Sequence, residues 1–258
     1  MASTADKAVL LRSLHVPGNP LIVTNVWDGA TARAVAAVPG VRALATASHA
    51  VSEAHGVADG EGLTVDQALD AARIIVRSVE LPVSVDFERG YSVDAAGVES
   101  NVRRLAEVGA AGLNFEDSVS DTAMRPLTEQ LERIAAVIAG SAAAAVPLSL
   151  NARVDALRRG EDFAQAIERG NAYLAAGATS VFVLGLSSPE LVAKAVAEID
   201  GPVAVIAQHG YLPLTQLADL GVARVSVGPG SQALTLTHLA AAAAVLTGRG
   251  GYPQELRF

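Results

Sequence analysis

The chain has 258 residues, of which 51% are hydrophobic and 18% charged, a length that suits one large hydrophobic core, with two small domains as the alternative. Its formal net charge is −8, and no stretch gathers Lys and Arg on one face with aromatic residues between them, which argues against a nucleic-acid partner. Because the chain has no cysteine, disulfides, thiolate metal sites and a cysteine nucleophile are excluded.

The amino-terminal residues 1–15 read MASTADKAVLLRSLH and predict a short amphipathic helix. They contain an acidic residue, Asp6, and no long apolar core, so a secretory signal is not expected. The most apolar stretches, residues 135–150 and 239–246, are rich in alanine and fall short of the ~20 apolar residues that span a bilayer. We therefore expect a soluble, cytoplasmic protein without a membrane partner.

Short apolar runs alternate with helical patterns along the chain. The runs that predict strands lie at residues 21–26, 43–47, 83–88, 112–116, 148–154, 180–186, 203–208 and 224–228. The patterns that predict helices lie at residues 29–38, 64–79, 94–108, 128–139, 162–176, 189–199, 213–220 and 231–246. Continuous apolar strands are typical of a parallel sheet that is covered on both faces. The alternation predicts a (β/α)8 TIM barrel as a single domain over residues 1–258. The alternative is a doubly wound open sheet, but the sequence lacks the GxGxxG turn that such a sheet would need.

Polar residues follow most of the predicted strands, at the end where the active site of such a barrel lies. They are Asn25, Trp27, Asp28, Ser48, His49, Asp86, Glu88, Asn114, Glu116, Asp117, Asn151, Arg153, Asp155, Gln208 and His209. An acid just after a strand can instead cap the next helix, and this alternative applies to Asp28, Asp117 and Asp155. The rim of the predicted barrel therefore collects acids from several strands around one arginine.

The stretch from Pro82 to Tyr91, PVSVDFERGY, is the clearest candidate site. Asp86 and Glu88 are two residues apart, and the alternation of a strand would place both side chains on one side. Neighbouring carboxylates repel each other unless a cation lies between them, so the pair predicts a site for a hard cation such as magnesium. Helix capping in this segment falls more naturally to Ser92 or Asp94.

Arg153 lies inside a predicted strand, where a buried guanidinium needs a carboxylate partner. That partner is either the substrate or, in a structural ion pair, Glu116. No HExxH motif or close pair joins the three histidines His49, His55 and His209, so a polar lining is expected of them rather than a zinc site.

Six segments carry a resemblance to a known family. In chain order they read NVWDGATARAV, HAVSEAHGVADG, VSVDFERGY, AAGLNFEDS, SLNARVDAL and AYLAAGATSVFVLGL. Over nearly its whole length the chain resembles the isocitrate lyase and phosphoenolpyruvate mutase superfamily. The resemblance implies a barrel that binds Mg2+, with Mn2+ as an alternative, and that chelates a 2-oxo acid or its enolate. It also implies a homo-oligomer, a dimer or tetramer, in which the last helix at residues 231–246 is exchanged.

The resemblance further implies roles for individual residues. Asp86 would be the direct metal ligand, with Asp59, Glu88 and Glu116 around it. Arg153 would pair with the substrate carboxylate, and backbone amides near Ser48 and His49 would complete an oxyanion site. The expected catalytic residues are Arg153, Glu116 and Tyr91. The expected substrate-binding residues are Trp27, Asp28, Ser48, His49, Asn114, Arg153, Gln208 and His209.

One part of the family pattern is missing. Lyases of the family carry a loop with a KKCGH-like sequence after the Glu-Asp pair that matches Glu116 and Asp117 here. In this chain, residues 117–126 contain no cysteine, lysine or histidine. We therefore expect a magnesium-dependent lyase or decarboxylase that stabilises an enolate of a small 2-oxo or 2-hydroxy carboxylate. The alternatives are C–P bond chemistry, of the phosphonopyruvate hydrolase or phosphoenolpyruvate mutase type, and a non-catalytic protein that binds a metal and a 2-oxo acid. The candidates for the missing general acid are Asn25, Ser48, His49, Tyr91 and His209.

Overall fold

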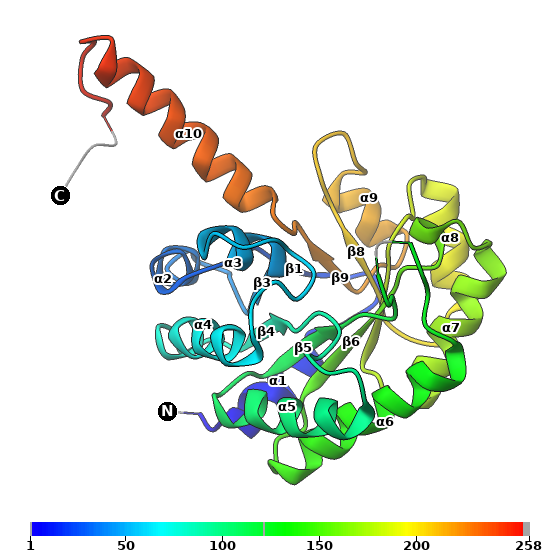
Figure 1. Ribbon diagram of the computed structural model, residues 1–258. Helices are drawn as coiled ribbons and strands as arrows, with labels where there is room; N and C mark the ends of the chain where they lie inside the picture. Colours follow the sequence, from blue (N-terminus) through cyan, green and yellow to red (C-terminus); the bar gives the residue numbers. More distant parts are fainter. Residues whose placement is uncertain (1, 121, 255–258) are drawn as a thin grey trace.

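The computed structural model describes residues 2–120 and 122–254, in which helices surround a ring of parallel strands (Figure 1). The strands are β1 (Leu21–Val23), β2 (Asn25–Val26), β3 (Leu44–Thr46), β4 (Val83–Asp86), β5 (Gly112–Phe115), β6 (Ser149–Val154), β7 (Ser180–Val183), β8 (Val203–Ile206) and β9 (Arg224–Ser226). Their order is β1-β9-β8-β7-β6-β5-β4-β3-β2, and every hydrogen-bonded pair is parallel. The predicted α/β barrel is confirmed, with the ring of strands nearly closed.

The predicted helices are also present, with ends that differ by a few residues. They are α1 (Thr4–Ser13), α2 (Gly29–Ala36), α4 (Val65–Arg77), α5 (Ala95–Glu107), α6 (Leu127–Ala143), α7 (Phe163–Ala175), α8 (Pro189–Glu198), α9 (Leu214–Asp219) and α10 (Gly230–Thr247). Two short elements, helix α3 (Ser48–Ala54) and the 3-10 turn η1 (Leu157–Arg159), were not predicted. Neither has a side chain that caps its first turn, so neither carries the usual helix-start signal.

The predicted first strand is split at Thr24, and this break is where the ring stays open. β1 pairs with β9 on one side, whereas β2 pairs with β3 on the other. The buried side chain of Asn25 joins the two sides: its Nδ2 donates to the Thr46 carbonyl at 2.8 Å, and its Oδ1 accepts from the Val227 amide at 3.0 Å. A side chain thus closes the barrel where the backbone ladder does not.

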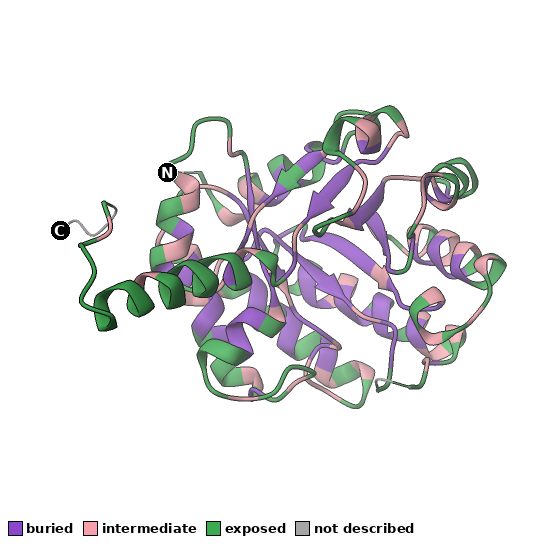
Figure 2. Ribbon diagram, turned by 90° about the horizontal axis from the view of Figure 1, so that it is seen from above, coloured by how far each residue is buried: buried purple, intermediate pink, exposed green. Residues whose placement is uncertain are grey.

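Most strand residues are buried (Figure 2). Helices cover the outside of the ring, and side chains fill its inside. Polar side chains in the interior bond to one another. Asn151 donates from Nδ2 to Asn114 Oδ1 at 2.9 Å, and its Oδ1 accepts from the Ser180 hydroxyl at 2.7 Å. The centre of the barrel is therefore packed, and open space is left at the ends of the strands.

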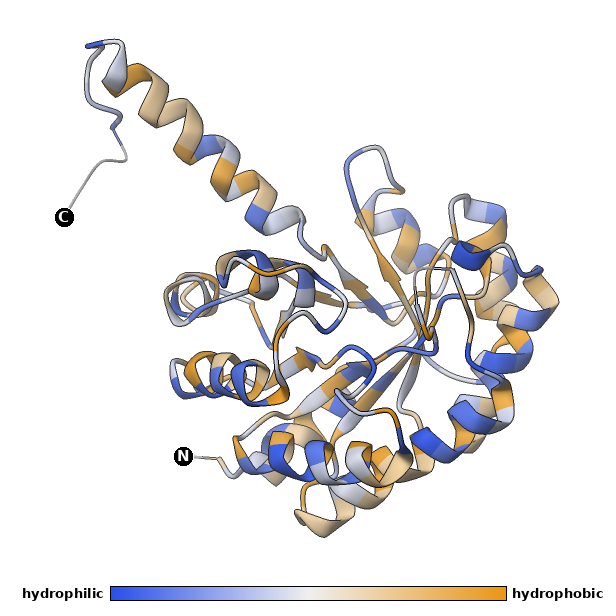
Figure 3. Cartoon of the chain, viewed as in Figure 1, coloured by the Kyte–Doolittle hydropathy of each residue, from blue (hydrophilic) through white to orange (hydrophobic). Residues whose placement is uncertain are grey.

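Helix α10 leaves the barrel and projects away from it (Figure 1). Its only buried residue is Gln232, whose Nε2 donates to the Ala50 carbonyl at 2.9 Å. Hydrophobic residues recur along this helix (Figure 3). Its exposed large apolar side chains are those of Leu234, Leu236, Leu239, Val245 and Leu246. Within residues 2–120 and 122–254, no helix combines the length and the apolar character needed to cross a membrane.

Close packing between α5 and α6 depends on Gly140. A Cβ at this position would lie 2.4 Å from the Glu99 carbonyl oxygen and 3.1 Å from the Arg103 amide nitrogen. We expect Gly140→Ala to lower the free energy of unfolding by ~1–3 kcal/mol through overpacking, although alanine is the better helix former by ~1 kcal/mol. Denaturant unfolding would measure this. The control Gly230→Ala, where a Cβ meets nothing within 4 Å, should be neutral or stabilising; an equal loss in both variants would contradict the packing argument.

Candidate active site

A pocket of about 470 Å³ opens at the carboxyl ends of the strands, a volume within the usual range for small-molecule sites. Of the residues predicted from the sequence, those that line it are Asn25, Ser48, His49, Asp59, Asp86, Asn114, Arg153 and Gln208. Those that do not line it are Trp27, Asp28, Glu88, Tyr91, Glu116, Asp117, Asn151, Asp155 and His209. The pocket thus gathers side chains from β3, β4, β5, β6 and the segment after β8.

Asp86, the last residue of β4, has one oxygen bonded and one left over. Its Oδ2 accepts from the Ser48 backbone amide at 2.9 Å, and its own amide donates to Thr46 Oγ1 at 2.8 Å. Its Oδ1 is buried and has no hydrogen-bond partner among the described residues. A buried carboxylate oxygen without a donor is costly, so this atom fits a cation that faces the pocket.

No group of three or more His, Cys, Asp or Glu side chains in the described part of the chain is arranged to hold a metal ion. A fully protein-made cage, as in structural zinc sites, is therefore absent from residues 2–120 and 122–254. Mg2+ is different, because it usually keeps several waters and takes only one or two carboxylates together with substrate oxygens. Asp86 as a single direct ligand fits that pattern.

Glu88 is buried and turns away from the pocket, toward the loop that carries Asp59. Its carboxylate accepts from the Glu61 amide at 2.5 Å and from the Tyr91 hydroxyl at 2.7 Å. Burial raises the pKa of Glu88 to about 7; the Tyr91 hydrogen bond opposes this rise and the charge of Asp86 adds to it. Glu88 therefore ties two rim loops together, while Asp86 alone of the pair faces the pocket.

The segment after β4 is held in a costly backbone conformation. Glu88 and Tyr91 have φ of 45° and 54°, and Glu61, which accepts from the Tyr91 amide, has φ of 65°. Such left-handed non-glycine residues cost ~1–3 kcal/mol each and persist only when their surroundings fix them. The buried Arg133 of α6 does this, because it donates to three carbonyls of residues 89–93 at 2.5–3.0 Å.

Arg153 on β6 lies between two carboxylates. Its Nη1 donates to Glu116, and its Nε and Nη2 donate to the two oxygens of Asp155 at 2.8 and 3.1 Å. Burial raises the pKa of Glu116, and the Arg153 charge opposes that rise. The ion pair between Arg153 and Glu116, one of the two partners considered from the sequence, is thus present. Arg153 also lines the pocket.

The helix-capping hypothesis is right for one of the three acids to which it applied. Asp28 caps α2 by accepting from the Thr31 amide at 2.7 Å. It is wrong for Asp155, which holds Arg153, and for Asp117, whose buried carboxylate accepts from the Asp155 amide at 2.9 Å and the Tyr173 hydroxyl at 2.8 Å. Asp117 therefore supports the segment that positions Arg153.

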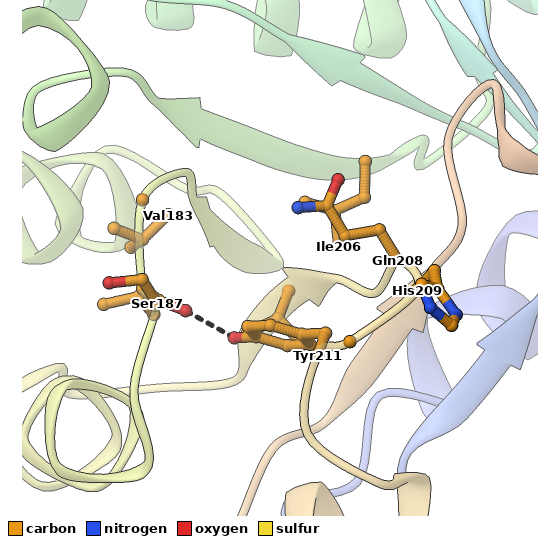
Figure 4. Close-up of a pocket in the computed structure, with 10 residues that line it drawn as sticks. Val183, Ser187, Ile206, Gln208, His209 and Tyr211 are labelled. Carbon is orange, nitrogen blue, oxygen red and sulfur yellow. Dashed lines mark hydrogen bonds between the residues drawn. The ribbon is translucent and has the colours of Figure 1, made fainter.

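A smaller pocket of about 280 Å³ adjoins the first and shares Gly185, Ile206 and Gln208 with it. His209 lines this second pocket only (Figure 4). The Tyr211 ring points toward the loop that carries Ser187, where its hydroxyl donates to the Leu186 carbonyl at 2.5 Å. This bond ties the loop after β7 to the loop after β8.

The pocket contains one cation that sequence reasoning missed, Arg158 of η1, which is exposed and lines the pocket. Gly185 permits this approach: it has φ of 99°, and a Cβ there would lie 2.8 Å from Leu157 Cβ. No local pattern pointed to Arg158, because η1 has no capping residue and lies outside the strand ends. Thr46 and Ser226, which also line the pocket, could have been found as the last residues of strands.

The amino-acid sequence is similar to that of known proteins. The family model of phosphoenolpyruvate phosphomutase matches residues 11–247. An uncharacterised protein of Mycobacterium tuberculosis strain H37Rv is 35% identical over 219 residues, which cover 83% of this chain and 80% of that protein. The 2-methylisocitrate lyase of Escherichia coli K12 is 28% identical over 235 residues, covering 83% and 78%.

The fold also matches solved structures. A phosphonopyruvate hydrolase, crystallised with oxalate and Mg2+, has a TM-score of 0.85 at 22% identity, covering 95% of this chain and 88% of that one. Lyases, decarboxylases and mutases that act on small carboxylates, typically with Mg2+, make up the superfamily to which these matches point. The family match and the 35% identical relative together show that this chain belongs to the phosphoenolpyruvate mutase and isocitrate lyase superfamily.

Proposed function

We propose that the protein is a Mg2+-dependent lyase or decarboxylase that stabilises the enolate of a small 2-oxo or 2-hydroxy carboxylate. The observation that carries this proposal is that Asp86 lines the pocket and that its buried Oδ1 has no hydrogen-bond partner among the described residues. Mg2+, or Mn2+ in its place, would be held by Asp86, with Asp59, Glu88 and Glu116 near it. When bound, the metal would supply Lewis-acid polarisation of the substrate carbonyl.

The chain's own residues would bind and orient the substrate. Arg153 and Arg158 line the pocket as cations, and Asn114, Ser48 and Gln208 add polar groups. Because Glu116 and Asp155 already neutralise much of the Arg153 charge, the exposed Arg158 is the better placed of the two to meet a carboxylate at the pocket mouth. These groups support an anionic substrate with at least one carboxylate.

Five side chains are candidates for the proton transfer. Asn25, Ser48 and His49 line the main pocket, whereas His209 lines the smaller one and the Tyr91 hydroxyl is engaged by Glu88. We propose His49 as the general acid. Its Nδ1 lies 3.7 Å from Asp59 Oδ2 at the half-exposed rim of the pocket, where the side chain is in contact with water.

We further propose a homo-oligomer, a dimer or tetramer, in a single-domain, cytoplasmic protein of residues 1–258. The supporting feature is α10, which exposes five large apolar side chains and has one buried residue. A second copy of the chain would cover them, since an exposed apolar stretch of this kind favours association.

The metal proposal predicts a ligand-dependent gain in thermal stability. Mg2+ with oxalate, a mimic of an enolate, should raise the Tm of the wild type by about 5–10 °C at ligand concentrations ~100 times Kd. Asp86→Ala should abolish this rise because it removes the free oxygen, whereas Asp70→Ala, on the outer helix α4, should retain it. A wild type without a Mg2+-dependent shift would contradict the proposal.

Assays of product separate the functions that share such binding. Release of pyruvate from one of a panel of 2-oxo and 2-hydroxy diacids is the expected result for a lyase or decarboxylase. A stability shift without any turnover would support the non-catalytic binding protein instead. Phosphate released from phosphonopyruvate would support C–P chemistry.

Metal binding should also depend on pH through Glu88. Its pKa of about 7 means that the side chain is half protonated near neutrality, and a nearby cation favours the ionised form. Mg2+ affinity should therefore rise with pH up to about 7 and level off above it, with proton release on binding. Calorimetry in buffers of different ionisation enthalpy measures the protons released; Glu88→Gln should release fewer, and unchanged release would contradict this role.

The oligomer proposal predicts a solution mass that is a multiple of 26.3 kDa by light scattering. Leu234→Lys combined with Leu239→Lys should shift the protein toward the monomer, because two buried charges would oppose the contact. The control His238→Lys adds a charge at an exposed polar position of the same helix and should leave the mass unchanged. A monomeric wild type would sink the proposal.

A further inference from the structure

Arg224 on β9 is an unusual buried cation. It is 1% exposed, and its Nη1 and Nη2 both donate to the Ser84 hydroxyl of β4 at 3.3 Å. No ion pair of Arg224 is present among residues 2–120 and 122–254. Its side chain therefore crosses the barrel interior and ends on a neutral partner.

Two other arginines of the barrel have several partners. The partly buried Arg153 bonds to two carboxylates, and the buried Arg133 donates to three backbone carbonyls. A buried guanidinium without a carboxylate is unfavourable, and replacing such a charge by an apolar residue of similar volume is often neutral or stabilising. Burial lowers the pKa of Arg224, and the charge of Asp86 opposes this fall. The arginine is therefore coupled to a residue that lines the pocket and not to an ion-pair partner of its own, which points to a role at the site.

The position of Arg224 in its strand places it directly beneath the pocket. Ser226, two residues further along β9, lines the pocket, as does Asp86, two residues beyond Ser84 on β4. Residues i and i+2 of a strand point to the same side and are ~7 Å apart along it. The guanidinium therefore lies one layer of side chains below Asp86, in the floor of the pocket.

His15, the titratable residue next to Arg224, does not add a second positive charge. His15, near the amino end of β1, is buried, and burial followed by the Arg224 charge lowers the pKa of His15 to about 4. His15 is consequently neutral at physiological pH. The positive charge at the barrel floor is that of the guanidinium.

We propose that Arg224 sets the electrostatic potential of the pocket floor, so that it favours a bound carboxylate anion and opposes a cation bound alone at Asp86. This inference rests on the proposed function and adds a positioning residue to it. A fixed positive charge ~7 Å away in a medium of low dielectric acts on both ligands with opposite sign. Metal and anion should therefore bind better together than alone. The anion offsets the repulsion between the metal and Arg224, and the metal offsets the repulsion between the anion and Asp86.

Arg224→Met removes the charge while keeping a side chain of similar length. We expect oxalate, at saturating Mg2+, to bind about tenfold or more weakly, and Mg2+ alone to bind about tenfold or more tightly. We also expect the Tm of the unliganded variant to be equal to or higher than that of the wild type. Opposite changes for the two ligands distinguish this role from structural damage, which would weaken both.

Three further variants complete the experiment. Arg224→Gln can still donate to Ser84 but carries no charge, so it should reproduce both binding changes, whereas Arg224→Lys should restore wild-type behaviour. The control Arg133→Met should lower the Tm, because that arginine has partners to lose.

Two results would overturn the inference while the proposed function stands: unchanged binding of both ligands in Arg224→Met and Arg224→Gln, or weaker binding of both. A lower Tm in both variants would likewise assign Arg224 to folding. A wild type that binds no oxalate with Mg2+ would instead remove the proposed function itself, and this inference with it.

Discussion

The arrangement of charge at the carboxyl end of the barrel is the constraint on which the rest of the site depends. Parallel strands that end together bring their acids into one small volume, where each buried carboxylate needs a donor or a cation. Arg153 answers that need for Glu116 and Asp155. Asp86 is the exception, since one oxygen accepts from an amide and the other has no partner among the described residues. The site is thus defined by a carboxylate oxygen that the described part of the fold leaves without a donor.

The loop after β4 has an unfavourable backbone conformation, which buried hydrogen bonds stabilise. Glu88 and Tyr91 adopt left-handed backbone conformations, which β-strands and helices avoid. Their mutual hydrogen bond and the bonds from Arg133 to the loop carbonyls fix these conformations. The geometry around Asp86 is therefore set before any ligand arrives, which is the condition for electrostatic stabilisation of a reacting anion.

The barrel and its rim could be predicted because their signals are local: short apolar runs, helical periods and polar residues at strand ends. The direction of Glu88 could not, since strand alternation was extended past Asp86, where the chain leaves the extended conformation. Arg158 lies in a turn without a capping signal. Arg224 has a partner 140 residues away, so the sequence shows a charged residue at the start of a strand but nothing about what it meets. Long-range pairing is what the local pattern lacks.

The absence of the family's loop sequence bears on which reaction suits this pocket. Retro-aldol cleavage needs a base to take the hydroxyl proton and an acid to protonate the leaving enolate. Among the described residues that line the pocket, none is a cysteine, lysine or tyrosine, and His49 with Asp59 lies at a half-exposed rim. Decarboxylation needs fewer acid and base groups from the protein, because CO2 leaves without a proton and the enolate can take its proton from water. Under the proposed function, a half-exposed rim together with the positive charges of Arg153, Arg158 and Arg224 would suit decarboxylation of a 2-oxo diacid better than a cleavage that depends on a sequestered acid.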